Sequence, residues 1–286
     1  MSGVVEQLVT DSVAARRRPK ATLILGLVLT GTIVLIALVS LFWLPYPLAD
    51  TSGSRLEGPS GLHLLGTDRL GRDLLSQLMW GARIALIVGA CAVAIAAVLG
   101  TIIGLLAAFS RPWVDDTLSA GLDVVIAFPV LLLAMLVVAI QGASLWSAVL
   151  AIGLAMSAVV ARLTRILARR VLQEQYVTAA RTSGTGVLGI VFQHVLPNIA
   201  PTLAVSLALQ FGAAVLAEAS LSYLGLGAPP PNASWGRMLQ EAQGTVLTAP
   251  VGAIAPGIAI IALVLGVNFL ADGLRDLADP TRRRSR

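Results

Sequence analysis

The sequence predicts an all-α integral membrane protein that crosses the membrane six times. Hydrophobic residues make up 57% of the 286 residues and charged residues only 12%, whereas soluble domains are about 25% charged. A helix needs about 20 apolar residues to cross the hydrocarbon layer of a bilayer. Six apolar stretches fit this requirement, at residues 22–44, 84–109, 118–140, 146–161, 199–221 and 251–271.

The first and fourth stretches need separate comment. The fourth is short, but its apolar pattern continues at helical spacing among arginines, through Leu163, Ile166, Leu167 and Val171. We therefore expect one helix that leaves the membrane and continues unbroken into the cytosol. The first stretch is too long for the apolar core of a signal peptide and ends without a small-residue cleavage site, so we expect it to be retained.

The positions of the basic residues predict that both termini are cytosolic. With the N-terminus inside, fifteen of the 20 lysines and arginines fall in cytosolic segments and five in external ones, which agrees with the positive-inside rule. This orientation predicts a cytosolic segment (1–21), a first crossing helix (22–44), an external loop with an amphipathic helix (45–83), a five-helix core (84–271) with a cytosolic loop at 162–198, and a basic cytosolic tail (272–286).

Two external segments are candidates for binding a partner. After the first crossing helix, Thr67 or Asp68 can begin a helix whose apolar positions are Leu70, Leu74 and Leu78. Such a helix either lies along the outer membrane surface or docks an external partner. The later loop at 222–250 holds glycines and three consecutive prolines, so it is a loop rather than a seventh crossing helix. The candidate docking residues of both segments are Asp68, Arg69, Arg72, Asp73 and Trp235.

Few polar side chains lie inside the predicted crossing helices. A charge at the centre of a bilayer costs on the order of 2.5–3.5 kcal/mol on insertion scales, so Asp123 and Glu218 should face protein or water rather than lipid. A place on a solute pathway and a structural pairing both remain open for Glu218. The candidate pathway or intramembrane polar residues are Asp123, Gln210, Glu218 and Asn268.

One crossing helix carries a stripe of small residues. Alanine or glycine recurs every four residues along the second stretch, at Ala92, Ala96, Gly100, Gly104 and Ala108. Small residues in one stripe allow two helix backbones to approach closely. The stripe therefore predicts a tight helix contact, either within this chain or with a partner subunit.

The residue types argue against catalysis and against a bound cofactor. A phosphate-binding P-loop needs a lysine after its second glycine, and the one lysine of this chain, Lys20, follows Pro19. The two histidines, His63 and His194, are too few for a histidine metal cluster, and the single cysteine lies in an apolar stretch. We expect no metal site, no cofactor bound by this chain and no enzymatic activity.

The cytosolic loop at 162–198 carries the most specific pattern. A short helix at 174–182 is expected to end at Ser183 and Gly184, and Leu196-Pro197 is expected to stop the loop before the fifth crossing helix. Thr178-Ala179-Ala180, with Gly184 four residues after Ala180 and Leu196-Pro197 further on, resembles the Glu-Ala-Ala loop of ABC-importer permeases. Three more segments make the chain similar to the second permease subunit of dipeptide, oligopeptide and nickel importers, over roughly residues 20–280: 65–73, 217–227 and 268–276.

The resemblance implies a type I ABC-importer permease architecture in a bacterial plasma (inner) membrane. It implies a homologous second permease, two ATPase subunits that bind ATP and Mg²⁺, an extracytoplasmic solute-binding protein, surrounding lipid, and no nucleic acid. Threonine stands at 178 where the family has glutamate, so an ion pair to the ATPase from that position does not carry over. The ATPase-coupling residues that the resemblance implies are Glu174, Thr178, Ala179, Ala180, Arg181, Gly184, Leu196 and Pro197.

Two other classes of protein are compatible with six crossing helices. A secondary transporter would be expected to show inverted repeats and interrupted helices in two halves, and a membrane scaffold would not explain the pattern of the cytosolic loop. Co-purification with an ATPase distinguishes these alternatives. The sequence leaves the solute open among dipeptides, longer peptides, nickel chelates and other small metabolites.

Overall fold

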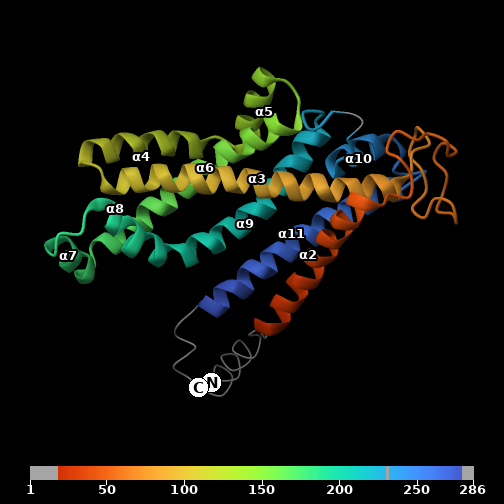
Figure 1. Cartoon of the computed structure of the whole chain (residues 1–286). Coiled ribbons are helices and arrows are strands. Elements are labelled where there is room, and N and C mark those ends of the chain that lie inside the picture. The colour runs from red at the N-terminus through yellow and green to blue at the C-terminus, as the bar shows by residue number, and fades with distance from the viewer. Residues whose placement is uncertain (1–18, 230–231, 279–286) are drawn as a thin grey trace, which may run out of the picture.

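The computed structural model describes residues 19–229 and 232–278, and these residues are largely helical (Figure 1). Five helices are long and apolar enough to cross a membrane alone, and a bent pair supplies a sixth crossing if its two halves count as one. The helices are α2 (Pro19–Phe42), α3 (Leu74–Phe109), α4 (Pro112–Ala127), α5 (Val130–Gln141), α6 (Leu145–Leu172), α7 (Gln175–Thr182), α8 (Val187–Gly189), α9 (Leu196–Tyr223), α10 (Trp235–Ala242) and α11 (Val251–Ala278). A π turn, Ile190–Val195, precedes α9, and a 3₁₀ turn, Gln243–Thr245, follows α10.

The α3 and α6 helices form the tight contact that the small-residue stripe predicts. A Cβ atom added at Gly100 would lie 2.5 Å from the Cβ of Val160, and one added at Gly104 would overlap the carbonyl oxygen of Ala161. Gly153 of α6 lies against Ile95 of α3 in turn, so the two helices run parallel along this contact. The stripe therefore packs within this chain.

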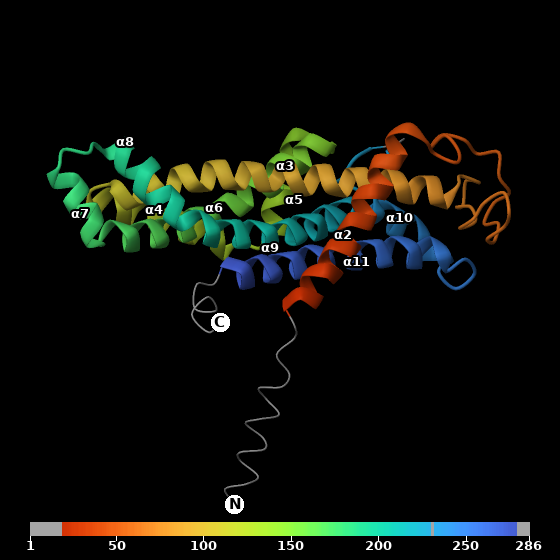
Figure 2. The ribbon, with the colours of Figure 1, turned by 60° about the horizontal axis from the view of Figure 1, so that its bottom comes forward.

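The α2 and α11 helices form a second close pair, and they run antiparallel (Figure 2). Gly26 of α2 lies against Leu270, while Gly266, one turn earlier on α11, lies against Thr30. A first and a last crossing helix that pack antiparallel agree with an even number of crossings and with termini on one side of the membrane. The arginines at 16–18, 282–284 and 286, on which the orientation partly depends, lie outside the described residues.

The segment predicted as the cytosolic loop and the two segments predicted as external loops lie at opposite ends of the molecule. The loop at 43–73 and α10 lie at one end of α3, and α7 and α8 lie at its other end, in both views (Figures 1 and 2). The α6 helix continues without a break from Leu145 to Leu172, which confirms the predicted extension of the fourth crossing helix into the segment before α7. No described helix between Tyr223 and Val251 is long enough to cross a membrane, as expected for that loop.

The prediction of one helix over 118–140 was wrong. The chain forms α4 and α5 instead, and they meet at an angle of 90°. Phe128 has an extended backbone (φ −83°, ψ 136°) in front of Pro129. Because the proline ring disfavours the helical conformation of the preceding residue, the helix ends there and a new one begins.

The prediction of a separate external helix starting at Thr67 or Asp68 was also wrong. The helix starts at Leu74 and continues directly into the second crossing segment, with Asp73 as its N-cap. The Asp68 carboxylate instead accepts hydrogen bonds from the backbone N–H groups of Leu70 and Arg72. These bonds fold a turn in which Gly71 has a φ of +81°, a conformation that glycine adopts at little cost.

Leu196-Pro197 does not mark the end of the loop, contrary to expectation. Helical structure begins at Val187, passes through the π turn and continues through α9 to Tyr223. Pro197 lacks a backbone N–H, and the wider π turn before it carries the helix past the missing hydrogen bond. The non-helical part of the 162–198 segment therefore ends near Gly186, ten residues before Leu196.

The α3–α6 contact predicts that alanine substitutions at two glycines change the stability of the subunit by very different amounts. Replacing Gly104 with alanine should force the two helices apart and cost about 1–3 kcal/mol, as overpacking does in other cores. Gly31 of α2 has nothing within 4 Å of an added Cβ, so Gly31→Ala should be neutral or slightly stabilising. Thermal unfolding of the detergent-solubilised subunit measures both, and equal melting temperatures for the two variants would contradict the packing described.

Candidate functional site

The short helix α7 matches the helix predicted at 174–182. Glu174 is its N-cap, with an extended backbone and an exposed side chain that makes no capping hydrogen bond. At the other end Gly184 has a φ of +89°. The N–H of Gly184 donates to the carbonyl of Arg181, and the N–H of Thr185 donates to that of Ala180. A left-handed glycine after the last turn is a common way to end a helix, so the predicted glycine break is confirmed.

One buried side chain seats α7 on the rest of the protein. Val177 is fully buried, and it belongs to a cluster formed mainly by α6, the π turn and the start of α9. The partners in this cluster include Ala168, Ile190, Val195 and Ile199. The remaining residues of α7 are exposed or half-buried. The helix therefore projects from the end of the molecule while its base is fixed.

The structure brings most of the predicted coupling residues together on this projecting helix. Thr178, Ala179, Arg181 and Gly184 are exposed, and Ala180 is half-buried. Leu196 does not lie on the projecting surface, because it packs against the cluster below α7. Pro197 is exposed at the start of α9.

Exposed apolar side chains next to α7 were not found from the sequence. Val187, Leu188 and Phe192 are 60–73% exposed, and the ring of Tyr176 lies 5.9 Å from that of His194 in the π turn. The spacing of Leu188 and Phe192, one helical turn apart, was the signal that could have identified them. Together with Tyr176 they form an apolar surface beside α7, which we call the α7 patch, and exposed apolar patches commonly mark sites of protein contact.

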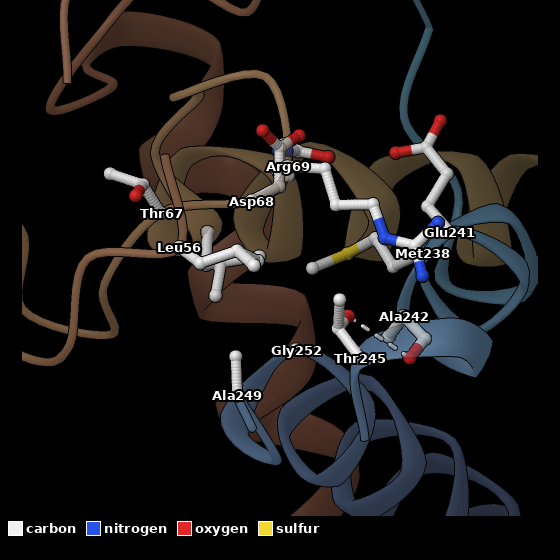
Figure 3. Close-up of a pocket in the computed structure, with 12 residues that line it drawn as sticks. Leu56, Thr67, Asp68, Arg69, Met238, Glu241, Ala242, Thr245, Ala249 and Gly252 are labelled. Atoms are coloured by element: carbon white, nitrogen blue, oxygen red, sulfur yellow. Dashed lines mark hydrogen bonds between the residues drawn. The ribbon is translucent and has the colours of Figure 1, made fainter. Parts of the chain in front are cut away.

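At the opposite end, ion pairs join the 65–73 segment to α10. The Arg72 guanidinium lies 2.6 Å from the Asp68 carboxylate and 2.5 Å from that of Glu241. Glu241 also pairs with Arg237 at 2.9 Å. Arg69 points into a small cavity between this segment and α10 (Figure 3). Asp68 and Arg72 therefore hold the loop at 43–73 in place.

Asp73 and Trp235 are buried and cannot offer their side chains to an external partner. The Asp73 carboxylate accepts hydrogen bonds from the backbone N–H and hydroxyl of Ser76 and lies 3.0 Å from Nδ1 of His63. The Trp235 indole donates to the carbonyl of Leu78 and lies against Gly81. Both were predicted as docking residues. Their contacts show instead that they fix the loop at 43–73 and α10 to α3.

The predicted intramembrane polar residues have different surroundings. Glu218 is buried against protein, where Ser222 donates to its carboxylate at 2.6 Å, in agreement with the expectation that this charge avoids lipid. Asn268 of α11 faces Gly212 of α9, and the side-chain nitrogen of Gln210 has no hydrogen-bond partner among the described residues. Asp123 is half-exposed and pairs with Arg162 at 2.8 Å.

Asp115, a carboxylate of α4 like Asp123, was not identified from the sequence. It is buried at the start of α4 and pairs with Arg165 and Arg169 of α6. The four-residue spacing of these arginines on one helix was the available signal. Within residues 19–229 and 232–278, no three His, Cys, Asp or Glu side chains come together as a metal site requires.

Residues 100–284 match the family described as binding-protein-dependent transport system inner membrane component. The chain belongs to this family. It is 39% identical to the dipeptide transport system permease protein DppC of Alkalihalophilus pseudofirmus, over 90% of this chain and 85% of that protein. It is 40% identical to the di/tripeptide transport system permease protein DppC of Pseudomonas aeruginosa, over 89% and 86% of the two chains.

Two further comparisons support the same family and fold. The glutathione transport system permease protein GsiD of Pectobacterium atrosepticum is 39% identical over 88% of this chain and 86% of its own length. A crystal structure titled an amino acid ABC transporter with histidines shares the fold at a TM-score of 0.53 and 20% identity, covering 73% of this chain and 94% of that one. The resemblance drawn from the sequence, and the all-α permease architecture that it implies, are confirmed.

The burial of Val177 under α7 predicts that the same substitution, valine to aspartate, has different effects on the fold at two positions. Val177→Asp places a carboxylate without a partner in an apolar cluster, which costs several kcal/mol, so α7 should detach. Val187→Asp makes the same change at a side chain that is 60% exposed and should leave the fold intact. Limited proteolysis of the purified subunit measures this, with rapid cleavage near α7 expected only for Val177→Asp. Equal cleavage of the two variants would show that Val177 does not anchor the helix.

Proposed function

We propose that this chain is the permease subunit of an ATP-driven importer of short peptides. The observation that carries the proposal is the 39–40% identity, over nearly nine-tenths of the chain, to permeases named for dipeptides, di/tripeptides and glutathione. Glutathione is itself a tripeptide, so the three names share one solute chemistry. Peptides of two or three residues are therefore the solute class that we assign to this chain.

The chain is proposed to act mechanically, while ATP and Mg²⁺ bind to two partner ATPase subunits. With its one lysine outside any P-loop pattern, it has no means of its own to hold a nucleotide in that way. Coupling to ATP hydrolysis then requires a rigid contact between the membrane helices and the ATPase. The projecting α7, seated by Val177 and flanked by the α7 patch, supports this role, since a fixed helix transmits force and its exposed surface can be covered by a partner.

The other partners follow from the two ends of the molecule. A homologous second permease is proposed to complete the solute pathway in a bacterial plasma membrane, with both termini in the cytosol. A solute-binding protein is proposed to dock at the end that carries the 65–73 segment and α10. The partly exposed Arg237 and Glu241, next to Arg72, are the candidate contacts there, and Asp73 and Trp235 support that surface from beneath.

Threonine at 178 gives the coupling helix a different charge pattern from the family's glutamate. The side chain of Thr178 is exposed, and the carboxylate of Glu174 is exposed one helical turn before it, where it makes no capping hydrogen bond. We propose that Glu174 presents to the ATPase the negative charge that position 178 lacks. A secondary transporter or a scaffold would have no need for a charge at either position.

The proposed orientation predicts opposite labelling at two loop positions. Cysteine at the exposed Ser54 should react with a membrane-impermeant thiol reagent in intact cells, and cysteine at the exposed Ser183 should react only after the membrane is opened. Cys91→Ala supplies the background for both, because Cys91 is the single cysteine of the chain. The reverse pattern would place α7 outside and exclude contact with a cytosolic ATPase.

The function and the coupling role are tested together in proteoliposomes that contain both permeases, the ATPases and the solute-binding protein. The wild-type complex should take up a labelled dipeptide only with ATP. Ala179→Arg puts a bulky charge on the exposed face of α7 and should abolish uptake and weaken recovery of the ATPase in a pull-down. Glu174→Gln should lower uptake by about tenfold, the scale of one hydrogen bond to a charged group, and Thr178→Glu in that variant should restore it.

Each failure in this experiment has its own meaning. Uptake by the wild-type complex without ATP would favour a secondary transporter, and no uptake of any short peptide would refute the solute class. Full uptake by Ala179→Arg would mean that α7 is an ordinary solvated connector.

A further inference from the structure

A polar cavity lies where the last turns of α3 and α6 meet α7. It has a volume of ≈ 350 Å³, and small-molecule sites have volumes of roughly 300–1,000 Å³ with a few placed polar groups. The cavity is therefore large enough for a small charged group. Its lining residues are Ala108, Phe109, Arg169, Leu172, Gln173 and Arg181.

Two guanidinium groups give this cavity an excess of positive charge. Arg165 and Arg169 both pair with the single carboxylate of Asp115, which balances one of their two charges. The side chain of Arg169 is still 42% exposed, and a guanidinium has five N–H donors, so it has donors left for a ligand. Arg181 pairs with no acidic side chain within residues 19–229 and 232–278. The chemistry of the cavity therefore suits an anion.

The end of α3 that lines the cavity lies at a membrane surface. The α3 helix exposes Leu106 at 58%, as a lipid-facing helix does, and it ends three residues later at Phe109. The chain then turns into α4 through Arg111, which is exposed, and Trp113, which is 67% exposed. Tryptophan is enriched at the boundary between hydrocarbon and water. Phe109 therefore lies where the hydrocarbon layer gives way to the lipid headgroups.

The packing of α6 against α3 places Arg169 at the same level. Thr164 of α6 packs against Gly104 of α3, and the two helices run parallel. Arg169 follows Thr164 by five residues, just as Phe109 follows Gly104, so the two side chains reach one cavity. The headgroup layer is roughly 5–8 Å thick on each side of the hydrocarbon. An anion held by Arg169 would lie within this layer.

We propose that this cavity binds the phosphate group of an anionic membrane lipid, with Arg169 and Arg181 as its two cations. The planar fork of arginine matches the oxygens of a phosphate, and basic pockets between membrane helices bind anionic headgroups. Phe109 and Leu172 supply an apolar wall for the part of the lipid next to the phosphate. Because Arg169 belongs to α6 and Arg181 to α7, one phosphate bound to both also links the projecting helix to α6.

The rival occupant is a carboxylate of a partner ATPase. The level of the cavity, in the headgroup layer and against the apolar end of α3, favours the lipid. The proposal needs this end of α3 to lie at a membrane surface and does not depend on the transported solute. It therefore goes beyond the proposed function and can fail without it.

The first test measures how fast a cysteine in the cavity reacts. Gln173→Cys in a Cys91→Ala background reports on the cavity, because Gln173 lines it and is exposed. This chain and its second permease are held in nanodiscs of phosphatidylcholine with or without phosphatidylglycerol and treated with an uncharged thiol reagent, and labelling of this chain is measured by mass spectrometry. Phosphatidylglycerol should slow the labelling about tenfold, the scale of one hydrogen bond to a charged group.

Matched variants separate binding in the cavity from a general effect of the charged lipid. A cysteine at Thr117 of α4, which is exposed and does not line the cavity, should react equally fast in both lipids. Adding Arg181→Gln to the Gln173→Cys chain should abolish the slowing. Arg111→Gln, which removes an exposed arginine next to the end of α3, should leave it unchanged. Equal slowing with Arg181→Gln and with Arg111→Gln would refute the site.

The link between α6 and α7 has a separate readout. Phosphatidylglycerol should slow cleavage near α7 by chymotrypsin, a protease that does not cut at arginine. The slowing is expected for the wild-type chain and for Arg111→Gln but not for Arg181→Gln. Equal cleavage of the wild-type chain in both lipids would show that no lipid ties α7 to α6.

Two further arms identify the source of the anion. Inorganic phosphate, added to the lipid-free complex in detergent, should not protect the cysteine at 173, and protection as strong as that by phosphatidylglycerol would replace the lipid with free phosphate. The ATPases, added to nanodiscs of phosphatidylcholine alone, should not protect it either. Protection by the ATPases that disappears with Arg181→Gln would show that the cavity is an ATPase contact and overturn the proposal. None of these results bears on peptide uptake, which tests the proposed function.

Discussion

The close approach of α3 and α6 is the contact on which the other features of the structure depend. Gly100 and Gly104 bring the two backbones together where any side chain would keep them apart. The α3 helix, with 36 residues, is about 54 Å long at 1.5 Å per residue. The loop at 43–73 leads into the first residue of α3. The α6 helix packs parallel to α3, and α7 follows its last residue. The position of α7 relative to the loop at 43–73 is therefore set by one tightly packed pair of helices.

At each end of this helix pair, a few buried side chains fix the adjoining segment to the pair. The outer surface of that segment remains exposed. Asp73, His63 and Trp235 fix the loop at 43–73 and α10 to the start of α3, while the charged groups around Arg72 remain partly exposed. At the other end Val177 fixes α7 and leaves most of the helix exposed. At both ends of the pair, the residues that fix the segment are buried, and part of the surface that they support stays exposed.

The α4 helix makes two kinds of polar contact with α6. Asp115 at the start of α4 is buried against Arg165 and Arg169, and this pairing holds α4 to α6 near the α7 end. Further along α4, Asp123 is paired with Arg162 but remains half-exposed. Both carboxylates belong to one helix and pair with one neighbour, yet Asp115 is buried and Asp123 is half-exposed.

The sequence alone determined the features that depend on composition and local chemistry. The crossing segments, apart from the 118–140 stretch, follow from apolar runs that a bilayer requires, and the end of α7 follows from the freedom of Gly184 to adopt a positive φ. The tight helix contact follows from the four-residue spacing of small side chains, and the family follows from four short motifs in order. None of these needs knowledge of what lies next to them in space.

Tertiary structure decided the features that depend on neighbours distant in the chain. Asp73 and Trp235 are polar or amphipathic residues in external segments, and only their contacts with His63, Leu78 and Gly81 show that they are buried supports rather than a docking surface. The helix starts at Leu74 rather than at Thr67 or Asp68 because Asp68 folds its own turn. Leu196-Pro197 does not mark the end of the loop, because helical structure already begins at Val187 and continues through a π turn. The pairing of Asp123 with Arg162 joins residues far apart in the sequence on two helices, so no local pattern could reveal which charge each one meets.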